Sequence, residues 1–194
     1  MKRSERDMAL RRGVTLIEVL LVVTLMGILI GMVMPRFDPG VADQLQSAAM
    51  VLTADIDYAR GLAVSNSSLY SITFEPTGNR YLIYHSGTNP ALETLPKSPF
   101  LTDANDATYG PVQIADFDEL LQMGPPVSLF TVRRLSTQAT ITSVEFGSLG
   151  NTTLNDVTVI WLTCGQGSAQ RYLPISISPI TGLTSIGGMV VPAP

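Results

Sequence analysis

The sequence predicts an α+β protein in which one long N-terminal helix packs on an antiparallel β-sheet. Three observations support this prediction. Residues 14–34 form an apolar run with Glu18 as its one charged residue. Residues 41–65 carry apolar side chains at alternating steps of four and three, which is the spacing of an amphipathic helix. From residue 69 onwards, short segments of alternating apolar and polar residues are separated by turn residues and indicate β-strands.

The apolar run of residues 14–34 has the length of a membrane-spanning helix, because about 20 apolar residues cross the hydrocarbon core of a bilayer. Residues 1–13 carry five Lys and Arg against two acidic residues, whereas residues 14–194 carry seven Lys and Arg against fourteen Asp and Glu. Basic residues before the run predict a cytoplasmic N-terminus and a C-terminal body in the periplasm. The acidic body argues against nucleic acid as a partner.

Glu18 is an ionisable residue near the start of this run, and the cost of a charge there indicates a function. The surrounding residues, Gly13-Val14-Thr15-Leu16-Ile17-Glu18, resemble the type IV prepilin signature, in which Gly is followed by Phe-Thr-Leu-Ile-Glu. The resemblance implies that a prepilin peptidase cleaves between Gly13 and Val14 and N-methylates Val14. Val14 departs from the usual Phe or Met but keeps an apolar side chain. Glu18 falls on the family's glutamate, and Pro35 falls on its helix-kinking proline.

Physical reasoning gives Glu18 a role in assembly. Cleavage after Gly13 leaves a charged amino group on Val14, four residues before Glu18. When subunits pack in a filament, this amine can pair with the carboxylate of a neighbour, and a paired charge in an apolar bundle fixes the register. The alternative is a plain signal anchor with a stray glutamate near the membrane interface. Pro35 removes a backbone donor and is expected to kink the helix, which then resumes.

The chain is expected to have four parts. These are a basic leader (residues 1–13), a transmembrane and filament-core helix (14–35), an amphipathic helix (36–66) and a β-rich periplasmic body (67–194). Within the third part, residues 41–65 should turn one apolar stripe towards the sheet. The stripe comprises Leu45, Ala49, Leu52, Ile56, Ala59 and Ala63.

Strand signals follow in order along the body. Residues 69–75 and 80–85 alternate on either side of a Pro-Thr-Gly-Asn turn and predict a hairpin. Residues 86–126 are expected to form a loop insertion with a short helical turn near residues 116–122. Further strands are predicted at residues 127–133, 140–146, 156–164, 171–178 and 183–186. The segment 156–164 is the most apolar and is expected to be a central strand.

Two segments of the body narrow the resemblance. Tyr58-Ala59-Arg60-Gly61-Leu62-Ala63 and Phe146-Gly147-Ser148-Leu149-Gly150 resemble motifs of the GspH/FimT group, which comprises minor pseudopilins of type II secretion and minor type IV pilins. The resemblance implies a pilin-like fold and a structural role instead of enzymatic activity. The favoured function is a minor pseudopilin of a type II secretion system, assembled into the pseudopilus that drives protein export. The alternatives are a minor type IV pilin for adhesion, motility or DNA uptake, and a signal-anchored periplasmic enzyme.

The implied partners are a prepilin peptidase, other pseudopilins or pilins in a filament, and inner-membrane lipid before assembly. No catalytic residue is assigned, because His85 is the only histidine and no Gly-x-Ser-x-Gly elbow occurs. Cys164 lies in an apolar strand and is expected to be buried. Arg133-Arg134 is the sole basic pair of the body, which gives little support to DNA binding.

No metal or cofactor is expected. The acidic residues of the insertion lack the spacing of an EF-hand calcium loop and are interpreted as solvated charges. They are Asp103, Asp106, Asp116, Asp118 and Glu119. No glycine-rich phosphate loop precedes a helix, so nucleotide binding has no support.

Overall fold

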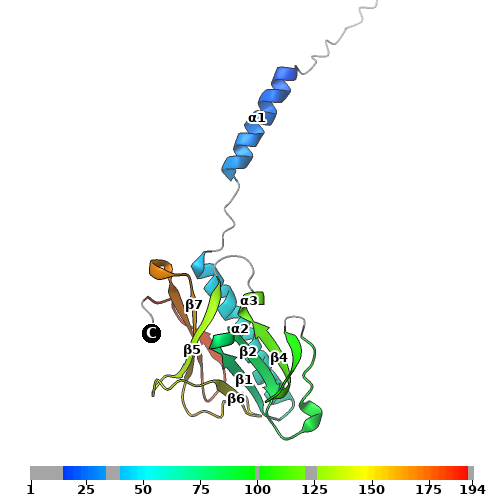
Figure 1. The fold of residues 1–194 in the computed structure, drawn as a ribbon, viewed down its shortest axis with the longest axis vertical. Coiled ribbons are helices and arrows are strands. Elements are labelled where there is room, and N and C mark those ends of the chain that lie inside the picture. The colour runs from blue at the N-terminus through cyan, green and yellow to red at the C-terminus, as the bar shows by residue number, and fades with distance from the viewer. Residues whose placement is uncertain (1–14, 34–39, 99–100, 121–125, 192–194) are drawn as a thin grey trace, which may run out of the picture. The chain divides into compact units, whose positions relative to one another are not determined.

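The computed structural model describes residues 15–33, 40–98, 101–120 and 126–191. The chain divides into two compact units, residues 1–37 and residues 38–194. The first unit contains helix α1 (Leu16–Val33). The second unit, called the body below, contains helix α2 (Val41–Ser65) and all the strands (Figure 1).

Helix α1 starts beside a threonine that can cap it. The backbone carbonyl of Thr15 accepts hydrogen bonds from the amides of Glu18 at 3.0 Å and Val19 at 3.2 Å. The Thr15 hydroxyl also accepts from the Glu18 amide at 3.4 Å, and threonine is a favourable residue before a helix. Further along, the hydroxyl of Thr24 donates to the carbonyl of Leu20 at 2.6 Å, so this polar group is satisfied within the helix. Among the described residues, no helix combines the length and hydropathy that crossing a membrane requires.

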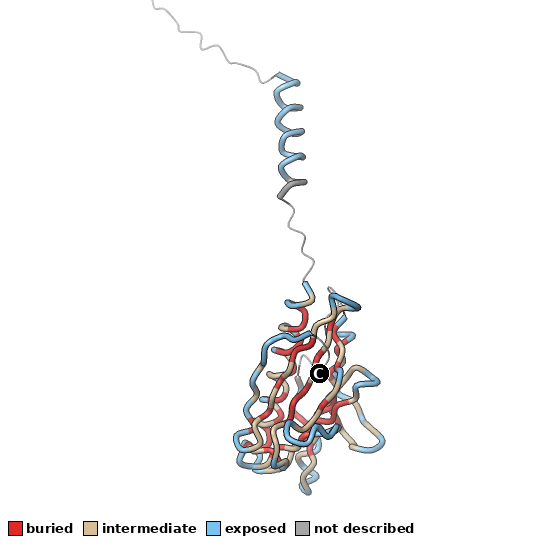
Figure 2. The backbone as a smooth tube through the Cα atoms, turned by 90° about the vertical axis from the view of Figure 1, so that its left-hand side faces the viewer, coloured by how far each residue is buried: buried red, intermediate tan, exposed pale blue. Residues whose placement is uncertain are grey.

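Helix α2 confirms the predicted amphipathic pattern. The six side chains of the predicted stripe are fully buried. The helix packs on strands of both sheets, and Met50, Ala54 and Asp57 face solvent on its other side. Figure 2 shows the buried positions of α2 and the strands inside the body. The helix ends at Ser65, and the backbone amide of the next residue, Asn66, donates to the carbonyl of Leu62.

Two antiparallel sheets complete the body, where the sequence predicted one. The five-stranded sheet has the order β3-β4-β2-β1-β6. Its strands are β1 (Tyr70–Glu75), β2 (Arg80–His85), β3 (Thr102–Asp106), β4 (Gly110–Asp116) and β6 (Ser143–Phe146). The four-stranded sheet has the order β5-β7-β8-β9 and contains β5 (Val127–Arg134), β7 (Thr158–Cys164), β8 (Arg171–Ile177) and β9 (Thr184–Ile186). The α+β class, with an N-terminal helix packed on antiparallel strands, is confirmed.

The core lies between α2 and the inner faces of the sheets. From the first sheet, Tyr70, Ile72 and Phe74 alternate inward, which is the period of a strand. From the second sheet, Ile160 and Leu162 of β7 contribute fully buried side chains. Strand β7 pairs with β5 on one side and β8 on the other, so the predicted central strand is indeed internal.

Residues 102–116 correct the expected loop. Strands β3 and β4 form a hairpin, and β4 pairs with β2, with Leu82 opposite Ile114. The prediction was wrong because β3 is a polar strand at the sheet edge and has no apolar face to bury. Pro111 also interrupts the apolar pattern of β4. Short helical turns complete the connections, at η1 (Pro76–Gly78), η2 (Pro90–Leu92), α3 (Phe117–Leu120) and η3 (Gly167–Ala169).

Candidate functional site

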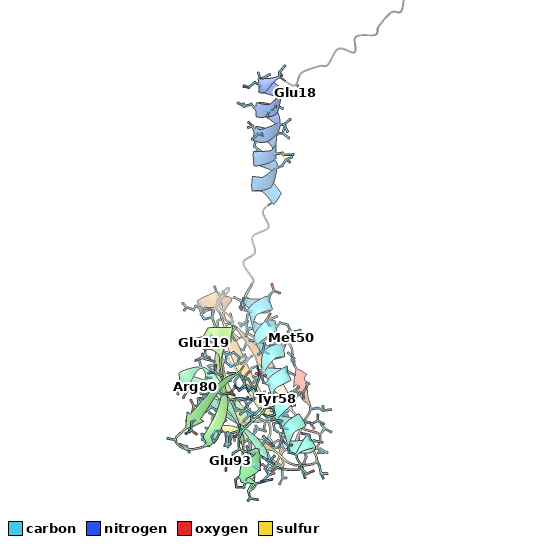
Figure 3. The ribbon with its side chains drawn as sticks, turned by 90° about the vertical axis from the view of Figure 1, so that its right-hand side faces the viewer. Glu18, Met50, Tyr58, Arg80, Glu93 and Glu119 are labelled. Carbon is cyan, nitrogen blue, oxygen red and sulfur yellow. The ribbon has the colours of Figure 1, made fainter. Side chains whose placement is uncertain are left out.

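Glu18 is the one predicted processing or assembly residue that the structure describes. It lies in the first turn of α1 and its side chain is exposed (Figure 3). A carboxylate in the first turn interacts favourably with the partial positive charge of the helix N-terminus. Gly13, Val14 and Pro35 lie outside the described residues. The predicted cleavage position and helix kink therefore stay predictions.

The surface of α1 is apolar on all sides. Its large aliphatic side chains between Leu16 and Leu29 are 48–83% exposed. A helix that is apolar all round is stable only when lipid or other protein segments cover it. The described part of α1 is therefore a binding element that requires an apolar environment, and Glu18 is the only charge that it presents there.

His85 ends β2 as a buried residue and contacts a serine. Its Nε2 lies 2.7 Å from the hydroxyl of Ser68, and its ring packs edge-on against Tyr70. A Ser-His-Asp triad needs a carboxylate on the other ring nitrogen. Within the described residues, the buried Nδ1 of His85 has no hydrogen-bond partner. The pair thus lacks the group that would orient a catalytic histidine.

Cys164 is buried at the end of β7, as its apolar strand predicted. Burial raises the pKa of its thiol, and a hydrogen bond from the backbone of Gly165 offsets part of this rise. A raised pKa lowers the thiolate fraction at neutral pH, and the thiolate is the reactive form. These observations describe a structural cysteine.

The acidic residues of the expected insertion make local hydrogen bonds. Asp103 accepts from Gln113 at 3.0 Å, and Asp106 accepts from the amides of Thr108 and Tyr109. Asp118 accepts from Asn79 at 2.7 Å. Among the described residues, no three potential metal-ligating side chains converge on one position.

Arg60 joins the two body segments that carry the GspH/FimT resemblance. Its Nε donates to the carbonyl of Gly150 at 3.2 Å and to the carbonyl of Thr181 at 2.9 Å. The arginine of the first segment thus holds the last glycine of the second. Gly182 packs against the same point, and a Cβ there would overlap the carbonyl oxygen of Gly150. We call these contacts of Arg60, Gly150, Thr181 and Gly182 the Arg60 clamp.

Asn79 is a structural residue that the sequence did not reveal. It has a left-handed backbone with φ +50°, a conformation that asparagine tolerates. Its side chain donates to the carbonyl of Val127 at 3.0 Å and accepts from the amide of Leu129 at 2.9 Å. Asn79 therefore ties the β1–β2 turn to β5 of the other sheet. The sequence feature that could have indicated this role is the position of Asn79 at the end of a predicted turn.

Comparison with known protein families gives a match at the N-terminus of the chain. Residues 8–34 match the prokaryotic N-terminal methylation motif, a range that includes Gly13, Val14 and Glu18. The chain therefore carries the N-terminal element of prepilin-type proteins. The match agrees with the prepilin signature that the sequence predicted at this position.

Solved structures and curated sequences give further comparisons. Two crystal forms of the type IV minor pilin FimU from Pseudomonas aeruginosa resemble the chain. One is 20% identical, covers 74% of this chain and 92% of its own, and has a TM-score of 0.44. The other is 19% identical, covers 76% and 90%, and has a TM-score of 0.46. No curated protein matches the chain.

Proposed function

We propose that the protein is a minor pseudopilin of a type II secretion system. The observation that carries the proposal is the methylation motif of residues 8–34, because prepilin-type proteins are processed and then assembled with other pilins. The acidic body supports a secretion role more than a DNA-uptake role. In this function the precursor is anchored in the inner membrane by the apolar run of residues 14–34. The processed chain then joins the pseudopilus that drives protein export.

Processing creates the charge that Glu18 uses. A prepilin peptidase cleaves between Gly13 and Val14 and methylates the new amine of Val14, which stays positively charged. In the filament this amine pairs with the Glu18 carboxylate of a neighbouring subunit. The exposed apolar surface of α1 is then covered by neighbouring helices, and pairing offsets the cost of enclosing the Glu18 carboxylate in that apolar contact.

Mass spectrometry of the mature N-terminus tests the processing step. The expected mature chain begins at Val14 and carries one methyl group on its amine. Expression without the prepilin peptidase should leave the leader of residues 1–13 in place. An unprocessed chain in peptidase-containing cells, or a cut after residue 35, would refute the proposal.

The substitution Glu18→Ala tests the assembly step. It removes the carboxylate and leaves the residues on either side of the cleavage position unchanged. We expect normal cleavage and methylation but at least about a tenfold loss of incorporation into filaments, because the neighbour's amine is left unpaired. Thr24→Ala on the same helix is the matched control and should incorporate normally. Normal incorporation of Glu18→Ala would contradict the pairing role.

A gene deletion separates secretion from the alternative of a minor type IV pilin. Loss of exoprotein export with intact pilus functions supports the pseudopilin. Loss of adhesion, motility or DNA uptake with intact export supports the pilin instead. Re-expression of the natural chain should restore the affected process. Re-expression of Glu18→Ala should not restore it.

A further inference from the structure

The two sheets of the body have four edge strands, β3, β6, β5 and β9, and among the described residues three of these edges are protected against pairing with another chain. The amide of Thr153 donates to the carbonyl of Glu145 at 2.9 Å and so covers part of β6. The side chain of Asn79 and residues 139–141 bond the edge of β5. Strand β3 carries two aspartates, and charge on an edge strand disfavours pairing.

The fourth edge, formed by β9 (Thr184–Ile186), lies open. The amide of Gly187 donates to the carbonyl of Pro174 at 2.8 Å, so Gly187 is part of a hydrogen-bonded pair with β8. Along an antiparallel ladder such pairs alternate with pairs that share no hydrogen bond. Ile186 and Thr184 fall on the alternate positions, so their amides and carbonyls point away from β8. Among the described strands, none lies beyond β9 to receive them.

The sequence along this edge lacks the residues that usually protect one. Residues 180–191 contain neither a charged side chain nor a proline. Apolar side chains flank the open backbone groups instead, and Leu183, Met189 and Val191 are 51%, 44% and 59% exposed. Open backbone groups beside apolar side chains are what an added strand needs for binding. We call residues 183–191 the β9 edge.

A bulge divides the β9 edge and limits what can pair with it. Gly187 lies opposite Pro174 and Val190 lies opposite Tyr172, so three steps on this strand match two steps on β8. A bulge bends its strand and increases the local twist. A rigid folded strand, such as the β9 of a second copy, therefore matches only the straight part at Thr184–Ile186. A flexible extended segment can follow the edge across the bulge.

Charge narrows the occupant further. The β9 edge offers no charged group, so a charged side chain of an incoming strand would lose water there without gaining an ionic partner. Residues 1–13 of the same chain are unsuited because they carry seven charged side chains, and α1 is helical. The edge therefore fits an uncharged segment that comes from a different polypeptide.

We propose that the β9 edge binds an extended, uncharged segment of another polypeptide, which becomes the fifth strand of the four-stranded sheet. The amides and carbonyls of Thr184 and Ile186 bond the backbone of this segment. Its side chains alternate between the two faces of the sheet. Those on the inner face lie next to Ile186, which packs against the core, and those on the outer face lie next to exposed Ser185. The segment should therefore carry apolar residues at alternate positions. The proposal goes beyond the secretion role and does not depend on it.

A strand attached to the full-length chain in detergent micelles tests the edge. The chain is extended after Pro194 by a flexible linker of about eight Gly and Ser residues and the strand Ser-Val-Thr-Val-Ser-Val-Thr, which gives a millimolar effective concentration. We expect hydrogen exchange at residues 184–186, followed by mass spectrometry, to slow at least about tenfold relative to the natural chain. The control fusion has prolines in place of the valines, which removes backbone donors. Equal exchange in the two fusions would refute the proposal, and exchange in β3 should be the same in both.

A substitution in β9 tests the same hydrogen bonds from the side of the body. Thr184→Pro removes an amide that points away from β8, and an edge strand accepts proline at such a position. In the fusion we expect it to abolish most of the protection at Ile186 while urea unfolding of the body stays cooperative. Thr184→Val keeps the amide and is the matched control. Protection that survives Thr184→Pro in folded protein would contradict the proposed pairing, and the proline fusion tests the same bonds without changing the body.

A separate peptide tests the identity of the occupant. The same strand as a peptide with capped ends, added at about 1 mM to the natural full-length chain, should slow exchange at residues 184–186. The peptide with prolines in place of the valines should not. Absence of protection by the first peptide would overturn the proposal. Protection that rises with protein concentration when no peptide is present, and that Thr184→Pro removes, would also overturn it, because the occupant would then be a second copy.

Discussion

Asn79 joins the two sheets of the body through one short side chain. Its amide group bonds the carbonyl of Val127 and the amide of Leu129, and both of these groups lie on the edge of β5 away from β7. An unpaired strand edge is open to pairing with other chains. Asn79 closes the first half of this edge, and residues 139–141 bond its second half at Val132 and Arg134.

The substitution Asn79→Ala tests this contribution. We expect a loss of about 2–4 kcal/mol in the free energy of unfolding, because hydrogen bonds are lost and alanine is strained at φ +50°. Urea unfolding of the purified chain measures it. Asn79→Gly relieves the backbone strain but does not restore the lost hydrogen bonds. It should therefore be only about 1 kcal/mol more stable than Asn79→Ala. Full recovery by glycine would show that the side chain contributes nothing.

Asp55 and Tyr81 form a polar contact at the edge of the core. The Tyr81 hydroxyl donates to the Asp55 carboxylate at 2.5 Å, and the Tyr81 side chain is fully buried. Burial raises the pKa of Asp55 above its ordinary value of 3.8, and the hydrogen bond from Tyr81 opposes part of this rise. The native state therefore binds more protons than the unfolded state between pH 3.8 and the raised pKa.

It follows that ionisation of Asp55 lowers stability as the pH rises through this interval. Asp55→Asn keeps an acceptor for Tyr81 but cannot ionise. The free energy of unfolding of Asp55→Asn minus that of the natural chain should therefore increase as the pH rises from 3.8 through the raised pKa of Asp55. Urea unfolding at a series of pH values measures the difference. A difference that is constant or that shrinks with pH would contradict the assignment. Asp57→Asn, at an exposed position, is the control.

Among the elements, those whose apolar residues recur with a strong helix or strand period were predictable from the sequence. The stripe of α2 and the alternation of β1 and β2 appear directly in the sequence, because each buries one face against the core. Strand β3 was missed because its stability comes from pairing with β4 and not from a buried face. The division into two sheets was also missed, since it depends on long-range contacts such as those of Asn79.

The candidate site, like the fold, was predictable from the sequence only where its residues are neighbours in the chain. The prepilin signature is a local string, so its residues from Gly13 to Glu18 could be named from the sequence alone, and the matched motif spans them. The Arg60 clamp is not local, because it joins α2 to carbonyls 90 and 121 residues away. The family resemblance marked two of its segments, but only the fold shows that they touch.

The Arg60 clamp leads to a prediction about how elements couple. Arg60→Lys removes the Nε donor and should cost about 1–3 kcal/mol, because two carbonyls lose a charged donor. Gly182→Ala should also destabilise, since its Cβ overlaps the carbonyl oxygen of Gly150. Both changes break the same contacts, so the double variant should lose less than the sum of the single losses. Urea unfolding of the four proteins measures the coupling. Strict additivity would show that the clamp does not act as a unit.

At the scale of the whole molecule, the buried core and the exposed apolar helix lie in different units. Every buried residue among those described lies between Gln44 and Gly182, within the body. The described side chains of α1 are exposed, so α1 contributes surface for association and no buried core. This division suits a protein whose N-terminal segment changes its surroundings while its body stays folded.

The body should therefore fold without the N-terminal unit. A chain of residues 38–194 is expected to unfold cooperatively, with a midpoint within about 3 °C of the body transition in the full chain, because it keeps all the described core contacts. Thermal unfolding followed by near-ultraviolet circular dichroism reports on the buried tyrosines, of which Tyr70 and Tyr81 pack between α2 and the first sheet. The variant Leu52→Ala within residues 38–194 is the control, and it should lower the midpoint strongly by opening a core cavity. An isolated body that lacks a cooperative transition would mean that its folding depends on residues 1–37.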